Sequence, residues 1–375
     1  MPKGLSILGF EPFDSGSHQA TRLAISKHSR HQWHWVTRPG RAWKWRMRIG
    51  SLELLKELES SGSQKPLSKI DAVFATSLLN LADLRAGLPK PLQQPPVVFY
   101  LHENQAAYPT RAIQGVPSQQ QASWDAQFAL TNLTSCAAAD LVVFNSNFNR
   151  TSFQRGLDEL LAHSPDSNLR GLVSEITQAS QIAWPPVEVP ATIQAATSKQ
   201  ALKEPSLVVW PHRWEHDKGP NELLETALRW SEHLNLRWIV LGESFREVPP
   251  AMRQMKEQLA GRIEHWGYAA DRSDYWGLLQ KADWVLSTAK HEFFGLAVCE
   301  ALMAGCLPWL PDRLSYPELV PEASRRLSPM NPPSHPNEHR SRIIKHLEPA
   351  LADKAVARID DLIESLVANH PNPAT

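Results

Sequence analysis

The sequence predicts an α/β protein built from two doubly wound domains, each a parallel sheet with helices on both faces. Three observations support this prediction. The chain has 375 residues, enough for about two domains that each bury a hydrophobic core. Short apolar runs alternate with helical patterns through both halves, as in parallel sheets with crossover helices. The proline-rich segment 184–190 and the polar tract that follows it to Glu204 predict a linker between the halves.

The overall composition is typical of a globular protein. Hydrophobic residues make up 42% and charged residues 21% of the chain, and it contains no run of 18 apolar residues of the kind that crosses a bilayer as a helix. The first apolar run, Leu5–Phe10, is too short and wrongly flanked for a signal peptide. We therefore expect a cytoplasmic protein without a membrane partner. Its three cysteines have no metal-ligand spacing, so we expect reduced, buried thiols.

The first half opens with a strand, a polar loop and a helix. Leu5–Phe10 predicts a buried strand, residues 11–18 its loop, and residues 19–29 the helix. Gly16 and Ser17 in such a loop can present backbone N–H groups to a ligand at the carboxyl end of the strand. A simple turn also uses glycine and serine, so the loop alone leaves both interpretations open.

Two further strands are predicted at 70–76 and 97–101, and the second ends in His102, Glu103 and Asn104. An apolar parallel strand that ends in polar residues places their side chains at the edge where α/β sheets bind ligands. Glu103 is a candidate for hydrogen bonds to a sugar or an acceptor, and Asn104 is a candidate beside it. A lone histidine is more often structural, so the interpretation of His102 depends on its position at the strand end.

A basic, tryptophan-rich stretch follows the first helix. Between residues 15 and 52 there is no acidic residue, and there are eight basic ones: Arg22, Lys27, Arg30, Arg38, Arg41, Lys44, Arg46 and Arg48. Because the whole chain has 39 basic and 39 acidic residues, this local asymmetry favours a polyanionic partner. Four tryptophans lie among the cations, and aromatic rings can stack on unpaired bases. The alternative is a solvated cationic face with buried rings.

The densest part of this stretch is Trp43–Arg48. As a strand or as a loop, it would present Lys44, Arg46 and Arg48 together, which suits a row of phosphates. We therefore expect the first half to contact nucleic acid. The candidate contacts are His18, Arg41, Trp43, Lys44, Trp45, Arg46, Arg48, Glu103 and Asn104.

The second half restarts with a predicted strand at Leu207–Trp210, whose loop carries Arg213 and Lys218. A helix is expected from Asn221 to Trp230. Two cations beside a helix N-terminus can converge on one diphosphate. On spacing alone, two surface cations would be the ordinary interpretation.

A strand, a glycine turn and a helix with two glutamates form the strongest chemical signal. Residues 284–288 predict a buried strand, Glu292 lies in the loop, and Gly295 precedes a helix that contains Glu300. The N–H groups of Gly295 and of the two residues after it would face a phosphate at the helix N-terminus. The spacing alone is also compatible with an amphipathic helix that carries two solvated glutamates.

This segment resembles the Glu-x7-Glu motif of retaining glycosyltransferases with the GT-B fold. Further strings resemble the tRNA-queuosine mannosyltransferases within glycosyltransferase family 4, and together they span essentially the whole chain. They are Glu11-Pro12-Phe13 with Gly16-Ser17-His18, Trp43-Lys44-Trp45-Arg46-Met47-Arg48, His102-Glu103-Asn104-Gln105 with Tyr108-Pro109, His212-Arg213-Trp214-Glu215-His216-Asp217-Lys218, and Arg313-Leu314-Ser315-Tyr316-Pro317-Glu318.

The resemblance implies a GT-B fold, in which two Rossmann-like domains face a central cleft. It implies an N-terminal acceptor domain at 1–185 with its basic stretch at 30–48, a linker at 186–205, a C-terminal nucleotide-sugar domain at 206–350, and a terminal helix at 351–375 that packs back on the first domain. The implied reaction moves mannose from GDP-mannose, with retention, onto the cyclopentene diol of queuosine 34 in a tRNA anticodon. The expected substrate is tRNA-Asp.

The resemblance also implies which residues form the site. Donor binding would use Gly16, Ser17, Arg213, Lys218, Glu292, Phe294, Gly295, Leu296, Ala297 and Glu300, and the catalytic set would be His102, Arg213, Lys218 and Glu292. In this assignment Arg213 and Lys218 hold the diphosphate. Glu292 binds the mannose hydroxyls, Glu300 binds the ribose, and His102 touches the donor sugar. No Asp-x-Asp motif lies in a suitable loop, so we expect no metal or other cofactor, and no obligate protein partner is evident.

Two other functions stay open. A GT-B transferase with a lipid or small-molecule acceptor would dock its cations and tryptophans on an anionic membrane, although no amphipathic apolar helix is evident beside them. A catalytically silent RNA-binding protein would have no need for Arg213, Lys218, Glu292 and Glu300.

Overall fold

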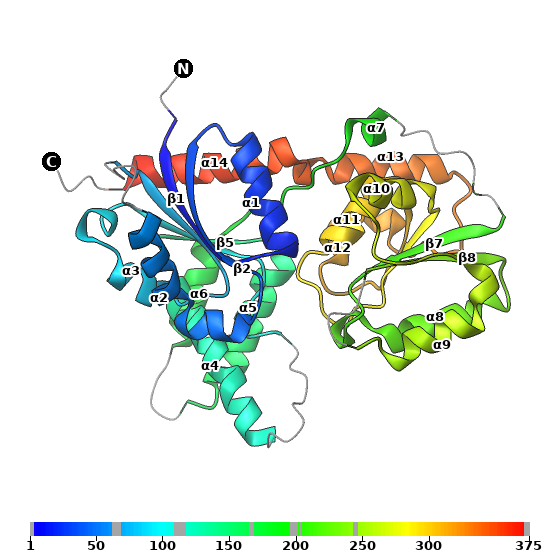
Figure 1. Cartoon of the computed structure of the whole chain (residues 1–375), viewed down its shortest axis with the longest axis horizontal. Helices are drawn as coiled ribbons and strands as arrows, with labels where there is room; N and C mark the ends of the chain where they lie inside the picture. The colour runs from blue at the N-terminus through cyan, green and yellow to red at the C-terminus, as the bar shows by residue number, and fades with distance from the viewer. Residues whose placement is uncertain are drawn as a thin grey trace. The chain divides into compact units, whose positions relative to one another are not determined.

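A computed structural model describes residues 4–61, 69–108, 118–164, 169–195, 202, 204–242 and 247–370. The chain forms two compact units of parallel α/β structure (Figure 1). Unit 1 combines residues 1–186 with residues 352–375, and unit 2 comprises residues 187–351. The predicted fold class of two doubly wound halves is confirmed. The stretch that the sequence suggests as a linker falls almost wholly within unit 2.

The sheet of unit 1 has six parallel strands in the order β2-β1-β3-β4-β5-β6. They are β1 (Ser6–Asp14), β2 (Gln32–Pro39), β3 (Ala72–Thr76), β4 (Val97–Leu101), β5 (Leu141–Phe144) and β6 (Gln181–Ile182). Because the strands are parallel, their carboxyl ends share one edge of the sheet. The segments that follow β1, β3 and β4 therefore lie near one another at that edge.

Helices bury both faces of this sheet. Val73 and Ala75 point into one core, which α2 to α6 cover, and Ala72 and Phe74 point into the other, which α1 and α14 cover (Figure 1). The helices are α1 (Gly16–His28), α2 (Trp43–Ser61), α3 (Leu81–Gly87), α4 (Ser118–Ala137), α5 (Asn147–Leu161), α6 (Arg170–Ala179) and α14 (Ala352–Asn369). Burial on both faces explains why the strands are nearly continuous apolar runs.

The first strand and helix have boundaries that differ from the prediction. β1 continues beyond Phe10, because its pairing with β2 includes Glu11 and resumes at Asp14 after a bulge. Glu11 therefore lies in the strand and not in the loop. α1 begins at Gly16, which has φ +54°, so His18 lies in its first turn and not in the preceding loop. Both shifts bring Glu11 and His18 to the same edge of the sheet.

The segment Trp43–Arg48 is the start of helix α2, and the expectation of a strand or loop is wrong. On a helix, residues four apart share a face, whereas residues two apart do not. Lys44 and Arg48 accordingly lie on one side. Arg46 points the other way, is buried, and forms an ion pair with Glu53. The three cations are therefore not presented together.

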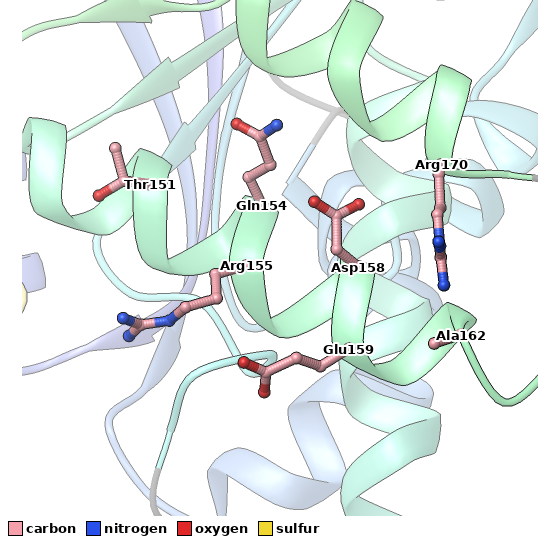
Figure 2. A pocket seen from close by; sticks show the side chains of 7 residues that line it. All are labelled: Thr151, Gln154, Arg155, Asp158, Glu159, Ala162 and Arg170. Atoms are coloured by element: carbon pink, nitrogen blue, oxygen red, sulfur yellow. The ribbon is translucent and has the colours of Figure 1, made fainter.

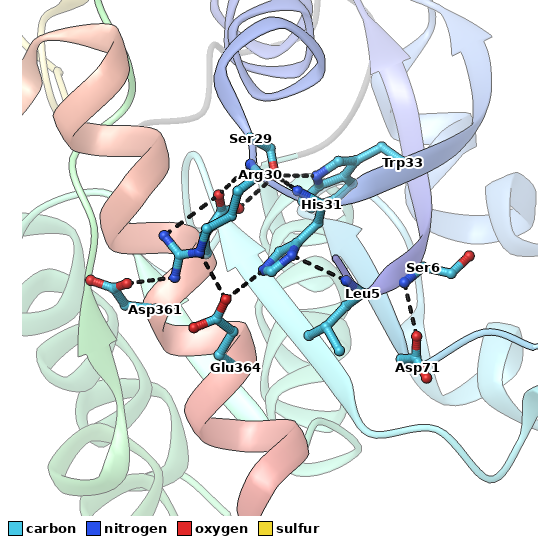
Figure 3. Close-up of polar contacts among 10 residues, drawn as sticks. Leu5, Ser6, Ser29, Arg30, His31, Trp33, Asp71, Asp361 and Glu364 are labelled. Carbon is cyan, nitrogen blue, oxygen red and sulfur yellow. Dashed lines mark hydrogen bonds and ion pairs between the residues drawn. The ribbon is translucent and has the colours of Figure 1, made fainter. Parts of the chain in front are cut away.

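Helix α14 returns the chain to unit 1 and is held there by polar contacts with the segment after α1 (Figure 3). The guanidinium of Arg30 donates to Asp361 at 2.6 Å and to Glu364 at 2.8 Å. The Ser29 hydroxyl donates to Asp360 at 2.7 Å. The apolar face of α14 is buried in the core that it shares with α1. Arg30 thus stabilises the fold, although its charge counts toward the basic stretch of the sequence.

The sheet of unit 2 has five parallel strands in the order β11-β10-β7-β8-β9. They are β7 (Ser206–Pro211), β8 (Leu236–Leu241), β9 (Ile263–Gly267), β10 (Trp284–Leu286) and β11 (Leu307–Trp309). Its helices are α7 (Ala191–Ala195), α8 (Pro220–Ser231), α9 (Pro250–Gln258), α10 (Arg272–Lys281), α11 (Leu296–Met303), α12 (Tyr316–Leu319) and α13 (Pro336–His346). β7 and β10 are neighbours, so the loops that follow them meet at the carboxyl edge.

Short 3-10 helices connect several elements: η1 (Lys90–Leu92), η2 (His216–Lys218), η3 (Ala260–Arg262), η4 (Glu322–Ser324) and η5 (Glu348–Ala350). Within the described ranges, no helix is both long and apolar enough to span a membrane. All three cysteines are buried free thiols, as the sequence predicts. Pro109, residues 196–201 and 203 of the expected linker, and residues 371–375 of the expected terminal helix lie outside the described residues.

Candidate active site

Two glycine turns bring the loops after β7 and β10 together in unit 2. Gly219 has φ +69°, and a Cβ atom there would lie 2.2 Å from the carbonyl oxygen of Thr288. The Thr288 hydroxyl lies 3.0 and 2.9 Å from the carbonyl oxygens of Lys218 and Gly219. Gly295, with φ +89°, ends the other loop at the start of α11. At Gly219, only glycine combines this backbone angle with so close an approach of the two loops.

Lys218 and Glu292 form a direct ion pair at this junction. The Lys218 Nζ atom lies 3.0 Å from Glu292 Oε2 and 3.4 Å from Asp217 Oδ2, and it donates to the carbonyl of His291 at 3.1 Å. Burial alone would lower the pKa of Lys218, but the two carboxylates outweigh this effect and raise it. The ammonium group therefore stays charged at neutral pH. The two residues lie together, as their predicted roles at one donor require.

Arg213 lies in the same loop as Lys218 and shares an acidic partner with it. Its guanidinium is 3.3 Å from Glu215 and 3.9 Å from Asp217, and its side chain is 49% exposed. Arg213 and Lys218 thus approach one another through Asp217. Two cations on one side of a strand end can stabilise the charge of a diphosphate leaving group.

The N-terminus of α11 faces the same junction. Gly295 is the N-cap residue of α11 and offers no side chain to bond the N–H groups of the first turn. Phe294 lies directly before it, buried, and its carbonyl accepts the Ser315 hydroxyl at 2.9 Å. Leu296 and Ala297 begin the helix and are partly exposed. These backbone N–H groups, beside Lys218, provide a place for an anionic oxygen.

Glu300 lies about one turn further along α11 and is held by two residues that sequence analysis missed. Its Oε1 accepts from Arg272 Nη2 at 2.8 Å, and its Oε2 accepts from the Tyr275 hydroxyl at 2.6 Å. The Arg272 guanidinium also lies 4.9 Å from the Tyr275 ring. Glu300 is only 6% exposed, so it is not a solvated surface glutamate. The cation at the first residue of α10 is the signal that could have indicated this contact.

A buried hydrogen-bond chain supports the loop ends. His212 Nε2 lies 2.9 Å from Ser287 Oγ, which lies 2.6 Å from the Tyr316 hydroxyl. Burial lowers the pKa of His212 well below its usual value, and the nearby cations act in the same direction. His212 is therefore neutral at neutral pH. This chain fixes the ends of β7 and β10 beneath Gly295.

A second polar cluster lies in unit 1, at the carboxyl edge of its sheet. The two ring nitrogens of His18 contact two carboxylates: Nδ1 is 3.0 Å from Glu11 Oε1, and Nε2 is 3.1 Å from Glu103 Oε2. Burial alone would lower the pKa of His18, but the carboxylates of Glu11 and Glu103 outweigh it and raise the pKa to about 10. Glu11 was not among the sequence candidates, because nothing local in the sequence indicates its contact with His18.

His102 stacks on His18 in this cluster, with ring centroids 4.0 Å apart. Burial lowers the pKa of His102 well below its usual value, and the charge of His18 lowers it further. Its Nε2 atom is buried and has no hydrogen-bond partner among the described residues. His102 is thus a neutral imidazole with one unused ring nitrogen. The contact with a donor sugar that the resemblance implies stays a prediction.

Ligand atoms of Glu11, His18 and His102 lie within 4.8 Å of one another, which raises the question of a metal ion. Metal ligation needs ring lone pairs that converge on one point. The two histidine rings are instead stacked nearly parallel, at 30°, and both nitrogens of His18 face carboxylate oxygens. This donor set fits an imidazolium between two carboxylates better than a metal centre.

Asn104 has a structural role and does not form part of the acceptor surface. Its side chain is fully buried, and its amide nitrogen donates to Asn149 Oδ1 at 2.8 Å and to Ser152 Oγ at 3.1 Å. Its side-chain oxygen accepts from the backbone N–H of Ala107 at 2.9 Å. Both ends of the amide are therefore used to fix the loop after β4 against α5. The expected tRNA contact of Asn104 is not compatible with this burial.

Acidic neighbours neutralise much of the basic stretch. Arg22 pairs with Asp14 at 2.8 Å, and Arg38 pairs with Glu57 at 3.1 Å. Arg30 and Arg46 also have carboxylate partners, so at least four of the eight cations form ion pairs among the described residues of unit 1. The alternative of a cationic face with buried rings therefore explains part of this stretch. Trp33 and Trp35 belong to that part, since they stack at 4.9 Å against the core.

The part of the basic stretch at the start of α2 lies on the surface of unit 1. The Lys44 ammonium lies 5.5 Å from the Trp43 ring, and the Arg48 guanidinium lies 5.5 Å from the Phe128 ring. Trp45 is 60% exposed, which is unusual for so large an apolar side chain. Arg41, just before the helix, is exposed as well. Cations beside an exposed ring are typical of surfaces that bind single-stranded nucleic acid.

Gly16 and Ser17 form the start of α1 next to His18. A Cβ atom on Gly16 would meet nothing within 4 Å, so its positive φ and not close packing explains the glycine. Ser15 offers no side-chain hydrogen bond as the N-cap of α1. Gly16 and Ser17 therefore lie at an exposed helix N-terminus, at the carboxyl edge of the unit 1 sheet.

Figure 2 shows a groove on α5 and the start of α6, away in sequence from the loops above. Thr151, Gln154, Arg155, Asp158, Glu159, Ala162 and Arg170 line it. It carries two basic and two acidic side chains, and none of these residues belongs to either polar cluster. We assign it no function in catalysis.

Comparisons with known proteins agree with this geometry. Residues 6–187 match the family described as tRNA-queuosine alpha-mannosyltransferase N-terminal, and residues 193–331 match the family described as glycosyl transferases group 1. A tRNA-queuosine alpha-mannosyltransferase from Drosophila melanogaster is 32% identical over 324 residues, which are 84% of this chain and 82% of the relative.

Solved structures support the fold class. A glycosyltransferase from Rickettsia africae superposes with a TM-score of 0.58 and 13% identity over 98% of this chain and 99% of that structure. The Anabaena protein HepE in complex with UDP gives 0.53 and 14% over 97% and 98%. The N-terminal domain of a Candida albicans trehalose-6-phosphate phosphatase gives 0.66 and 11% over 96% and 97%. The two parallel α/β units therefore form a GT-B fold.

The relative from Drosophila extends along both units, and the two matched families divide between the unit with the His18 cluster and the unit with the Lys218–Glu292 pair. Identity at this level over so much of both chains establishes the relationship: the chain belongs to the tRNA-queuosine alpha-mannosyltransferase family.

Proposed function

We propose that this chain transfers mannose from GDP-mannose onto the cyclopentene diol of queuosine in a tRNA anticodon. The observation that carries the proposal is membership of the tRNA-queuosine alpha-mannosyltransferase family over most of the chain. As a member of that family the chain is a glycosyltransferase. Three parts of the proposal need experiment: the donor, the stereochemistry, and queuosine 34 of tRNA-Asp as the acceptor.

The junction of the loops after β7 and β10 in unit 2 supports a nucleoside diphosphate sugar as the donor. Lys218, Arg213 and the N-terminus of α11 place positive charge and N–H donors around one point. Such groups stabilise the charge that develops on the diphosphate as it leaves. Glu292 beside Lys218 is suited to accept hydrogen bonds from hydroxyls of the transferred sugar, and Glu300 is suited to the ribose.

We propose that the reaction retains configuration by attack on the same face of the sugar. The bond between the anomeric carbon and the phosphate oxygen breaks, and the acceptor hydroxyl forms the new bond to that carbon. The hydroxyl proton passes to an oxygen of the departing phosphate. In this scheme Arg213 and Lys218 stabilise the phosphate, and no metal ion is required.

The start of α2 supports a nucleic acid as the acceptor. Arg41, Lys44, Trp45 and Arg48 combine cations with an exposed aromatic ring. Phosphate contacts would supply affinity for any tRNA, and contacts to the modified base would supply specificity. A reaction on tRNA also suggests that the protein acts in the cytoplasm.

Transfer to defined tRNAs tests the proposal. Purified protein is incubated with GDP-mannose and with tRNA-Asp that carries either queuosine or guanine at position 34, and the nucleosides are analysed by mass spectrometry. We expect a hexose on queuosine only. Digestion of the product with α- and β-specific mannosidases reports the stereochemistry, and UDP-glucose and GDP-glucose report donor choice. Equal transfer to guanine-containing tRNA, or transfer to neither, would overturn the proposal.

A further inference from the structure

The bridge Glu11–His18–Glu103 links three separate elements at the carboxyl edge of the unit 1 sheet. Glu11 comes from β1, His18 from the first turn of α1, and Glu103 from the segment after β4. Among the described residues, His18 is the cation that contacts both carboxylates, at 3.0 Å for Glu11 and 3.1 Å for Glu103. The bridge therefore fixes the position of one carboxylate relative to the other.

Exposure differs along the bridge. Glu11 is wholly buried and His18 is nearly so, whereas the Glu103 side chain is 17% exposed. Of the three side chains, only that of Glu103 is partly exposed to solvent. Glu103 is thus the group that a ligand can touch, and the other two lie behind it.

The carboxylate of Glu103 can accept further hydrogen bonds, whereas that of Glu11 has little remaining acceptor capacity. Glu11 Oε1 accepts from His18 and from the backbone N–H of Phe13, and its Oε2 accepts from Thr76. Glu103 Oε2 accepts from His18, and its Oε1 accepts from Ser77 at 2.8 Å. A carboxylate oxygen can accept about two hydrogen bonds. Each oxygen of Glu103 can therefore accept a ligand hydroxyl without losing its present contact.

The bridge requires a protonated His18. Because both ring nitrogens face carboxylate oxygens, both can donate only when the ring is an imidazolium. Two further titratable side chains of the described residues lie at the cluster: His102 stacks on His18, and Tyr100 packs edge-on against His102. β3 contributes the hydroxyl of Thr76 to these contacts, and the next residue, Ser77, contributes another hydroxyl.

We propose that Glu103 binds a hydroxyl of the acceptor diol, and that Glu11 and His18 are positioning residues that fix the Glu103 carboxylate for this contact. The inference rests on the proposed function, in which the acceptor carries a neutral vicinal diol. A carboxylate accepts hydrogen bonds from hydroxyls and repels phosphates, so this site suits the diol and not the tRNA backbone. Glu103 would therefore contribute to discrimination between queuosine and guanine.

Kinetics of Glu103→Gln test the contact. With queuosine-containing tRNA we expect kcat/KM to fall roughly 10- to 100-fold, the range for loss of a hydrogen bond to a charged group. Asp14→Asn is the control, because Asp14 ends β1, the strand that carries Glu11, but pairs with Arg22 and not with His18. We expect its kcat/KM to stay within roughly a factor of two or three of wild type, because the Asp14–Arg22 ion pair includes neither His18 nor Glu103. Wild-type kcat/KM in Glu103→Gln would overturn the proposal.

The pH profile of Glu11→Gln tests the positioning role. The pKa of His18 is raised to about 10 in the wild type, so kcat/KM should not change through His18 between pH 6 and 8.5. Glutamine removes one of the two charges that hold the proton, and burial then favours neutral His18. We expect the variant to lose activity as pH rises through this range, and to approach wild type at the acidic end. A flat profile parallel to wild type would overturn the role of Glu11.

A direct measurement covers the case in which Glu11→Gln does not fold. The ring carbon and nitrogen shifts of His18 in the wild-type chain, assigned with His18→Gln, report its protonation by NMR. A charged ring at pH 8 supports the bridge, and a neutral ring overturns it. Absence of transfer by the wild type to queuosine-containing tRNA would instead overturn the proposed function, and the NMR result would still decide the state of His18.

Discussion

The two sheets each hold a buried cation at the carboxyl edge, and the two cations are bound differently. Lys218 has an ammonium group with three donors, which contact Glu292, Asp217 and a backbone carbonyl. His18 has two donors in one plane, and both are used by Glu11 and Glu103. An ammonium on a flexible stem can exchange one partner for a phosphate. The imidazolium would have to release a carboxylate to do so.

This difference suggests different functions. Lys218 is suited to meet a charged substrate, because a diphosphate can replace a carboxylate among its partners. His18 is suited to hold two protein groups in place. We therefore expect Lys218 to bind substrate directly, and His18 to position Glu103, which binds substrate.

The largest effect is expected from Lys218→Ala. Loss of one preorganised charge donor costs about 2–4 kcal/mol of transition-state stabilisation, which is roughly 30- to 900-fold in kcat/KM. Steady-state kinetics with queuosine-containing tRNA measure it. Arg237→Ala is the control, since Arg237 pairs with Glu264 on the surface of unit 2, with both side chains about 40% exposed. If Lys218→Ala and Arg237→Ala were equally active, the assignment of Lys218 to the donor would be wrong.

A smaller effect, on stability, is expected from Gly219→Ala. The alanine would have to adopt φ +69° with its Cβ 2.2 Å from the Thr288 carbonyl, so we expect a loss of at least about 2 kcal/mol. Gly277→Ala is the control in the same unit: Gly277 lies within α10 and a Cβ there meets nothing within 4 Å. It should gain up to about 1 kcal/mol. Denaturant unfolding of both variants measures the difference, and equal stability would contradict the tight approach of the two loops.

The sequence predicted the donor junction better than the His18 cluster, and the reason is distance along the chain. Arg213, Asp217 and Lys218 lie within one loop, and the Glu292 motif lies on one strand, loop and helix. Local patterns therefore indicated the elements, and parallel pairing of β7 with β10 brought them together. The Glu11–Glu103 bridge joins residues 92 positions apart, and only the sheet order reveals it.

The basic stretch illustrates a different limit. Counting cations does not show which of them have acidic partners, and those partners lie far away in sequence, as Asp361 and Glu364 do for Arg30. A wrong choice of period for Trp43–Arg48 also placed Arg46 on the wrong face.

The salt dependence of tRNA binding sharpens this correction. Lys44→Ala with Arg48→Ala should reduce the slope of log affinity against log salt by roughly 1–2, because each phosphate contact releases close to one counterion. Arg46→Ala should leave the slope unchanged, because Arg46 is buried and paired with Glu53, and should lower stability instead. Binding titrations at several salt concentrations test both. A reduced slope in Arg46→Ala alone would restore the row of three cations that the sequence suggested.

No effect at all is expected from removal of divalent metal. In unit 2, Arg213, Lys218 and the N-terminus of α11 already supply positive charge where a diphosphate would leave. In unit 1, the stacked rings of His18 and His102 and the hydrogen bonds of His18 to both carboxylates disfavour a metal ion. Transfer to queuosine-containing tRNA is measured with excess EDTA, after dialysis against chelator, and with Mg²⁺ or Mn²⁺ restored. Loss of activity that Mg²⁺ or Mn²⁺ restores would mean that a metal ion, and not the two cations, stabilises the leaving group.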